Sequence, residues 1–270
     1  FPYTTLFRSG VGNAVRGQAN VVGTHGMGFT AQMIVWPDAF CSRLVDRGFH
    51  VIRFDNRDCG LSGKLDGVSV DPNAVMHARL AGSALPPVPY TLSDMAFDAI
   101  GLLDHLGIDA AHVVGASMGG MIAQTMAIEH PRRVRSLISI MSMTGELEYG
   151  SPTPEAGEVL LAAPPTDRQA YIDNSISARV WQSRRYFDEK RVREDAARGF
   201  DRSFYPEGSA RQLAAISASG SRADGLSELR VPTLVVHGTE DTLLQPDGGR
   251  RTAELVPGSS LLMLADMGHD

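Results

Sequence analysis

Residues 111–131 read AHVVGASMGGMIAQTMAIEHP, and this stretch decides the fold. It opens with a short apolar run at 112–114, which predicts a β-strand. It continues at 120–129 as an apolar segment of helical length that a His-Pro pair closes. Between the two lies Gly115-Ala116-Ser117-Met118-Gly119, a G-x-S-x-G sequence. The pattern therefore predicts a strand, a sharp turn and a helix in immediate succession.

Ser117, at the centre of this turn, is the predicted nucleophile. Such a turn forces the serine into a strained backbone conformation, and side chains larger than Gly two residues to either side would collide. The turn lifts the hydroxyl clear of the sheet and points the N–H of Met118, at the helix N-terminus, toward an oxyanion formed there. A glycine-rich phosphate loop is the competing interpretation, but no P-loop lysine follows and no G-x-G-x-x-G is present.

Short apolar segments alternate with amphipathic ones along much of the chain. This alternation predicts βαβ units and the α/β class, with a mostly parallel central sheet flanked by helices. The predicted strands are 19–22, 49–54, 112–114, 134–141, 232–236 and 261–264. The predicted helices are 37–47, a segment that begins at the Thr91-Leu92-Ser93-Asp94 capping box, and 120–129.

The composition and hydrophobic pattern of the sequence change in its second half. From residue 146 the chain is polar, rich in Arg, Asp and Ala, and without a strand-like apolar run until strands resume near residue 231. This predicts an inserted helical cap at 146–227, between a first core segment at 10–145 and a second at 228–270.

Both ends of the chain are unusual. Residues 1–9, FPYTTLFRS, have no Met and no hydrophobic period. They resemble the in-frame translation of a sequencing-library adapter, so we set them aside as a non-native segment. A genuine extended first strand is the competing interpretation. Because the chain stops one residue after His269, we expect the helix that should follow the last strand and cover the sheet to be missing. Because the start is abnormal, we expect the first strands to be incomplete.

A serine hydroxyl is a good nucleophile only when a base takes its proton and an acid orients that base. In this architecture the acid and then the His follow the nucleophile along the chain. Asp241 lies past the predicted strand 232–236 in a Gly-x-x-Asp turn and is the predicted acid. Glu240 is the competing carboxylate, and His237 is expected to pack within the turn. Of the eight histidines, His269 alone follows the acid and is the predicted base.

Composition excludes several classes of function. The 270 residues carry a net charge of -6 and are 43% hydrophobic, enough for one sizeable core. The acidic balance argues against a nucleic-acid partner and an anionic membrane. No apolar run approaches the ~20 residues needed to span a bilayer. The two cysteines, Cys41 and Cys59, form neither a disulfide framework nor a zinc spacing, so we expect a reduced cytoplasmic setting with no metal and no cofactor.

With nucleophile, acid and base in this order around an inserted helical segment, the chain resembles the α/β-hydrolase superfamily over roughly residues 20–269. The segments VIRFDNRDCGLS (51–62) and HVVGASMGGMIAQTMAIEHPRRVRSLISIMS (112–142) look like the carboxylesterase-type branch that includes aclacinomycin methylesterase-like proteins.

The resemblance implies an oxyanion hole built from two backbone N–H groups. One is that of Met118, directly after the nucleophile. The other comes from a loop after an early strand, usually behind a His-Gly pair, and here that loop is His25–Phe29. Measured from Trp36 with the family's spacing, His25 lies too early, so Phe29 is the expected second donor and Met27 the alternative.

The resemblance also implies hydrolysis of a small-molecule carboxylic ester through an acyl-enzyme. Met141 and Met143, at the base of the cap, would line an apolar pocket or serve as core filler. C–C bond or enol-lactone hydrolysis, aminopeptidase action and perhydrolysis share the same triad and stay open. A ligand receptor without catalysis is an alternative of another class. Ser117 argues against epoxide hydrolysis and dehalogenation, which use an Asp nucleophile in this fold. The acyl and alcohol groups and the oligomeric state do not follow from the sequence.

Overall fold

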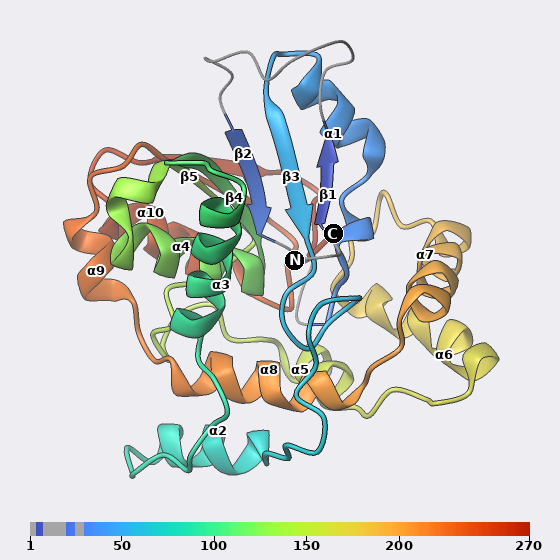
Figure 1. Ribbon diagram of the computed structural model, residues 1–270. Coiled ribbons are helices and arrows are strands. Elements are labelled where there is room, and N and C mark those ends of the chain that lie inside the picture. Colours follow the sequence, from blue (N-terminus) through green and yellow to red (C-terminus); the bar gives the residue numbers. More distant parts are fainter. Residues whose placement is uncertain (1–3, 8–19, 25–29) are drawn as a thin grey trace.

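The computed structural model describes residues 4–7, 20–24 and 30–270 of the chain. These residues form a seven-stranded sheet in the order β1-β3-β2-β4-β5-β6-β7 (Figure 1). Every neighbouring pair is parallel except β1 and β3, which are antiparallel. The strands are β1 (Thr4–Phe7), β2 (Asn20–Thr24), β3 (His50–Phe54), β4 (Ala111–Ala116), β5 (Val134–Ile140), β6 (Thr233–Gly238) and β7 (Ser260–Leu264). The predicted α/β class with a mostly parallel sheet is confirmed.

Each predicted strand is present in the structure, with bounds that differ by a few residues. β4 runs on through Gly115 and Ala116, which are weak strand formers, because it lies between two parallel partners and is covered on both faces. β1 falls inside the segment 1–9 that we set aside. The interpretation of that segment as an extended strand describes what the structure shows at Thr4–Phe7, and its non-native origin stays a prediction.

Helices cover the two faces of the sheet. Successive side chains of a strand point to opposite faces, so Ile52 and Val113 lie on one face and Val51 and Val114 on the other. Ile52 and Val113 belong to the main hydrophobic core, together with side chains of α3 (Leu92–His105) and α4 (Met118–Glu129). The opposite face of β3 and β4 is covered by α1 (Asp38–Val45). The remaining core elements are η1 (Met33–Val35), α2 (Pro72–Leu80), η2 (Pro131–Arg133) and α10 (Pro246–Leu255).

The chain between β5 and β6 consists of helices joined by loops. Residues 141–232, all of them described, contain no strand. Their elements are α5 (Pro154–Leu161), α6 (Arg168–Asn174), η3 (Ser175–Val180), α7 (Glu189–Arg202), α8 (Glu207–Ala218) and α9 (Ala223–Glu228). In Figure 1 the arrowheads of β2 and β3 point toward α5 and α8, so these helices lie off the carboxyl end of the sheet. The helix α9 reaches past the predicted cap boundary at 227 and packs through Leu226 in the main core. The division at 146 and 227 stays a prediction.

Two buried ion pairs fasten α7 and α8 to the loop after β3. Arg211 Nε donates to Asp58 Oδ2 at 2.7 Å and Arg211 Nη2 donates to Asp58 Oδ1 at 3.0 Å. Both side chains are almost fully buried, at 4% and 0% exposed. Arg202 Nη2 makes a single bond to Asp55 Oδ2 at 2.7 Å, with Arg202 16% exposed and Asp55 fully buried. No helix in the described part of the chain is both long and apolar enough to cross a membrane.

We expect Arg211→Ala to lower the free energy of unfolding by about 3–5 kcal/mol, because it leaves the buried Asp58 carboxylate without its partner. Urea unfolding followed by circular dichroism measures this. Arg168→Ala is the matched control, since Arg168 forms the same two-bonded contact with Asp201 on the surface. Equal stability of the two variants would contradict the importance given to the buried pair.

Candidate active site

The turn between β4 and α4 holds Ser117 in a conformation that few residues adopt. Ser117 has φ 55° and ψ -123°, in the region that disfavours side chains. A Cβ on Gly115 would overlap the backbone carbonyl of Gly119, and one on Gly120 would lie 2.6 Å from Ser142 Cβ. Gly115 and Gly120 are therefore required because the first turn of α4 starts almost in contact with β4 and with Ser142.

Two hydrogen bonds, to the neighbouring strand β5 and to Ser142 just beyond it, hold the backbone around Ser117. Ser117 N donates to Ile140 O at 2.9 Å, and Ser142 Oγ donates to Ser117 O at 2.9 Å. Sequence reasoning missed Ser142; its signal was a hydroxyl just beyond β5, at the same sheet edge as Ser117. Met118 is the first residue of α4, and its N–H makes no hydrogen bond to another described residue. First-turn N–H groups lack helical partners, so this one is available to an oxyanion.

Asp241 is buried at the carboxyl end of β6 and has both of its carboxylate oxygens occupied. Oδ1 accepts hydrogen bonds from the N–H groups of Leu243 and Leu244, each at 2.9 Å. Oδ2 accepts from His269 Nδ1 at 2.7 Å. Burial on its own raises the pKa of this carboxyl, but His269, His237 and the hydrogen bonds outweigh burial and lower the pKa to about 2. Asp241 is thus a carboxylate throughout the neutral range.

His269 follows β7 and is 4% exposed. Because the Asp241 carboxylate can only accept, Nδ1 carries the proton of that bond, and Nε2 of the neutral ring keeps its lone pair. Nε2 is buried and makes no hydrogen bond within the described part of the chain. The structure therefore brings together the predicted acid and base in the orientation that leaves Nε2 available to accept a proton.

Glu240 and His237 lie in the same turn as Asp241 but make different contacts. Glu240 places its backbone N–H 2.9 Å from Met267 O, and no described residue bonds its buried Oε2. His237 is fully buried and bonds Leu244 O through Nε2 at 2.8 Å, within the turn as expected. The same Nε2 lies 3.3 Å from Asp241 Oδ2, so His237 also faces the carboxylate.

The predicted second oxyanion donor, Phe29, and its alternative Met27 lie outside the described residues. The next residue, Thr30, has φ 72° and is held from two sides. Its N–H donates to Oε1 of the buried Gln212 of α8 at 2.7 Å, and its carbonyl accepts from Cys59 Sγ at 3.0 Å. Burial raises the pKa of the Cys59 thiol to about 12, so Cys59 is a structural donor and not a nucleophile.

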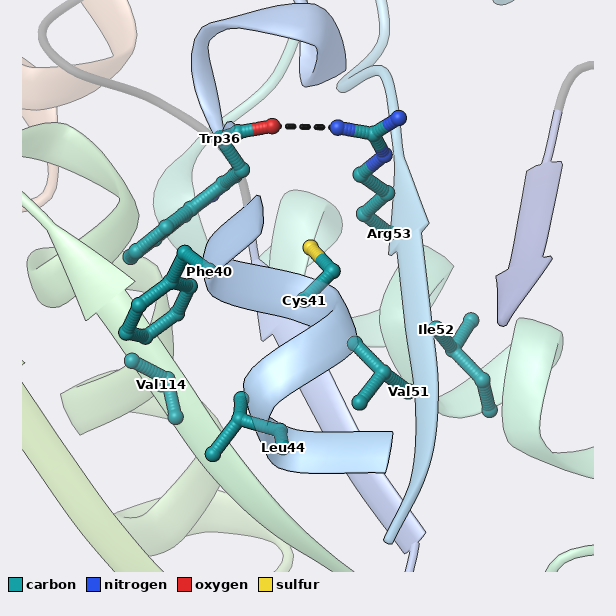
Figure 2. A pocket seen from close by; sticks show the side chains of 8 residues that line it. All are labelled: Trp36, Phe40, Cys41, Leu44, Val51, Ile52, Arg53 and Val114. Carbon is teal, nitrogen blue, oxygen red and sulfur yellow. Dashed lines mark hydrogen bonds between the residues drawn. The ribbon is translucent and has the colours of Figure 1, made fainter. Parts of the chain in front are cut away.

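The two methionines at the predicted base of the cap lie in the packed interior. Met141 is 2% exposed, and Met143 packs against the main core. An apolar hollow exists elsewhere, between α1, β3 and β4, lined by Trp36, Phe40 and Val114 among others (Figure 2). Its volume of about 20 Å³ fits a single water molecule, and it contains none of the predicted catalytic side chains.

Comparison with known proteins agrees with this architecture. The family model described as "alpha/beta hydrolase fold" matches residues 25–270. The chain belongs to the α/β-hydrolase fold family.

The relatives of this hydrolase differ in the bonds they cleave. It is 28% identical over 257 residues to the rhodomycin D methylesterase DnrP of Streptomyces peucetius, covering 87% of this chain and 80% of that protein. It is 28% identical over 278 residues to a 2-hydroxy-6-oxononadienedioate/2-hydroxy-6-oxononatrienedioate hydrolase of Cupriavidus pinatubonensis. This match covers 98% of this chain and 85% of that protein. The enol-lactonase of Burkholderia xenovorans LB400 has a similar fold, with a TM-score of 0.71, 24% identity and coverage of 99% and 88%.

We expect Gly115→Ala to destabilise the protein by about 1–3 kcal/mol and to remove reactivity at Ser117, because the new methyl overlaps the first turn of α4. Gly157→Ala in α5 is the control, since its Cβ would meet nothing closer than 3.8 Å and Ala favours a helix. Urea unfolding and labelling of Ser117 by a fluorophosphonate measure both effects. A Gly115→Ala protein as stable and reactive as Gly157→Ala would contradict the steric argument.

Asp241→Asn is expected to slow fluorophosphonate labelling of Ser117 by about 10⁴-fold, because the amide no longer holds the imidazole in the tautomer with a free Nε2. Glu240→Gln tests the competing carboxylate and should leave the labelling rate within a few-fold. Intact-mass spectrometry over time gives both rates. If Glu240→Gln lowered the labelling rate more than Asp241→Asn, the acid would be Glu240 and not Asp241.

Proposed function

We propose that this α/β hydrolase is a serine esterase that cleaves a small-molecule carboxylic ester through an acyl-enzyme. The observation that carries the proposal is the buried 2.7 Å hydrogen bond from His269 Nδ1 to Asp241 Oδ2, together with the strained turn that presents Ser117. The similarity to rhodomycin D methylesterases supports an ester as substrate.

The first half of the reaction forms the acyl-enzyme. Ser117 Oγ bonds to the carbonyl carbon while His269 Nε2 takes its proton, and the carbonyl π electrons move onto oxygen. The N–H of Met118 and the predicted donor Phe29 stabilise this oxyanion. Asp241 stabilises the imidazolium without taking the proton itself. When the tetrahedral intermediate collapses, the alcohol leaves with the proton that His269 returns.

The second half repeats these roles with water. His269 Nε2 takes a proton from water as its oxygen bonds to the acyl carbon. The ester bond to Ser117 then breaks, and the serine oxygen regains the proton. The carboxylic acid leaves and the site is restored, so the reaction needs no metal, cofactor or further reactant in this scheme.

C–C bond hydrolysis is the second candidate, favoured by the similarity to 2-hydroxy-6-oxo-dienedioate hydrolases that extends over 98% of this chain. The same three side chains would serve, with a carbanion in place of the alkoxide as leaving group. A receptor that binds a ligand without turnover is the alternative of a different class. It predicts a single turnover with the product retained.

We expect hydrolysis of p-nitrophenyl esters, from acetate to decanoate, that Ser117→Ala abolishes. The length profile of kcat/KM reports the size of the acyl pocket. Release of p-nitrophenol is followed at 405 nm, a wavelength at which the phenolate absorbs, with folding of each variant checked by circular dichroism. No ester turnover in a folded protein that cleaves a 2-hydroxy-6-oxo-dienoate would overturn the esterase proposal in favour of C–C hydrolysis. A single burst of p-nitrophenol without further turnover would favour the ligand-receptor alternative.

A further inference from the structure

Four residues of the cap segment, Val180–Ser183, lie across the two loops that carry the predicted acid and base. We call them the cap strap. At one end, Thr242 Oγ1, next to Asp241, donates to Val180 O at 2.8 Å. In the middle, His269 N donates to Trp181 O at 2.7 Å. The strap is therefore bonded to the residue after the acid and to the base itself.

The contact between the strap and the base loop is too close for any side chain at residue 268. A Cβ on Gly268 would overlap Trp181 O and would lie 2.6 Å from both Gln182 C and Ser183 N. The φ of Gly268 is not in the positive region, so backbone conformation does not demand glycine here. The glycine before His269 is required because the strap passes directly against it.

Ser183 holds the loop on both sides of His269. Its Oγ accepts from Gly268 N at 2.9 Å and donates to the Asp270 carboxylate, while its own N–H donates to Asp270 Oδ1 at 3.1 Å. Ser183 is only 3% exposed, so water cannot readily replace these bonds. On the surface, Arg185 Nη1 adds an ion pair to Asp266 Oδ2 at 2.8 Å.

We propose that Ser183 is a positioning residue that holds the imidazole of His269 between Asp241 and Ser117, a role that rests on the esterase proposal above. Within the described part of the chain, the loop that carries His269 is otherwise held to the core by its side-chain bond to Asp241 and by the backbone bond from Glu240 N to Met267 O. A misplacement of about 1 Å can cost about 10²-fold in rate. Docking of the cap thus sets the geometry of proton transfer, in addition to covering the substrate.

The test uses Ser183→Ala together with the pair Ser183→Thr and Ser183→Val. Thr and Val have nearly the same volume and differ by the hydroxyl, so their ratio isolates the hydrogen bonds from any overpacking. Ser175→Ala is the control, because the one hydrogen bond of its hydroxyl to a described residue goes to Ile172 O inside the cap. Each variant is assayed for kcat and KM on a p-nitrophenyl ester and for the rate of fluorophosphonate labelling of Ser117, at a temperature where circular dichroism shows it folded.

We expect Ser183→Ala and Ser183→Val to lower kcat and the labelling rate by about 10- to 100-fold with KM within about twofold. Ser183→Thr should recover at least half of that loss on a logarithmic scale, and Ser175→Ala should match the unaltered protein. Equal losses in Thr and Val, or a labelling rate that Ser183→Ala does not change, would overturn the proposal. Absence of labelling in the unaltered, folded protein would instead overturn the esterase proposal.

Discussion

The closeness of β4 to the first turn of α4 is the constraint on which the site depends. Ser117 has a positive φ, and Gly115 and Gly120 leave no space for a methyl against Gly119 and Ser142. This contact fixes the backbone of the turn at Ser117 and sets how near the helix lies to the sheet. The apolar residues of α4 then fill the core beneath the site, so the strain at one serine is maintained by the packing of an entire helix.

The site also depends on how the negative charge of the Asp241 carboxylate is stabilised. A buried carboxylate without partners would be protonated, yet this one accepts two backbone N–H groups and faces two imidazoles. The second imidazole, that of His237, needs Gly249 opposite it, since a Cβ there would overlap its ring. The charge of the acid is thus secured by the turn after β6 and by α10, neither of which touches the substrate in the proposed mechanism.

Local patterns in the sequence were sufficient to predict six of the seven described strands, all but β1, and also the capping box at Thr91 and the approach of Asp241 to His269. They were sufficient because strand periodicity and chain order are local or topological properties. The contacts of Ser142, Ser183 and Gln212 were not predictable in the same way. Each joins segments whose approach is decided by how helices pack, and a single serine or glutamine carries no periodic signal that points to a partner up to 182 residues away.

The predicted cap contacts the core at several places, among them the strap at 180–183 and the stretch from Arg202 to Gln212. Between these two anchors, residues 186–198 form exposed ion pairs with one another along α7 and with Asp173 of α6. A chain held at both ends in this way can gain or lose residues in the middle without moving either anchor. Variation in length among such caps is therefore best tolerated at 186–198, where it would reshape the outer wall of the molecule and leave the alignment of His269 intact.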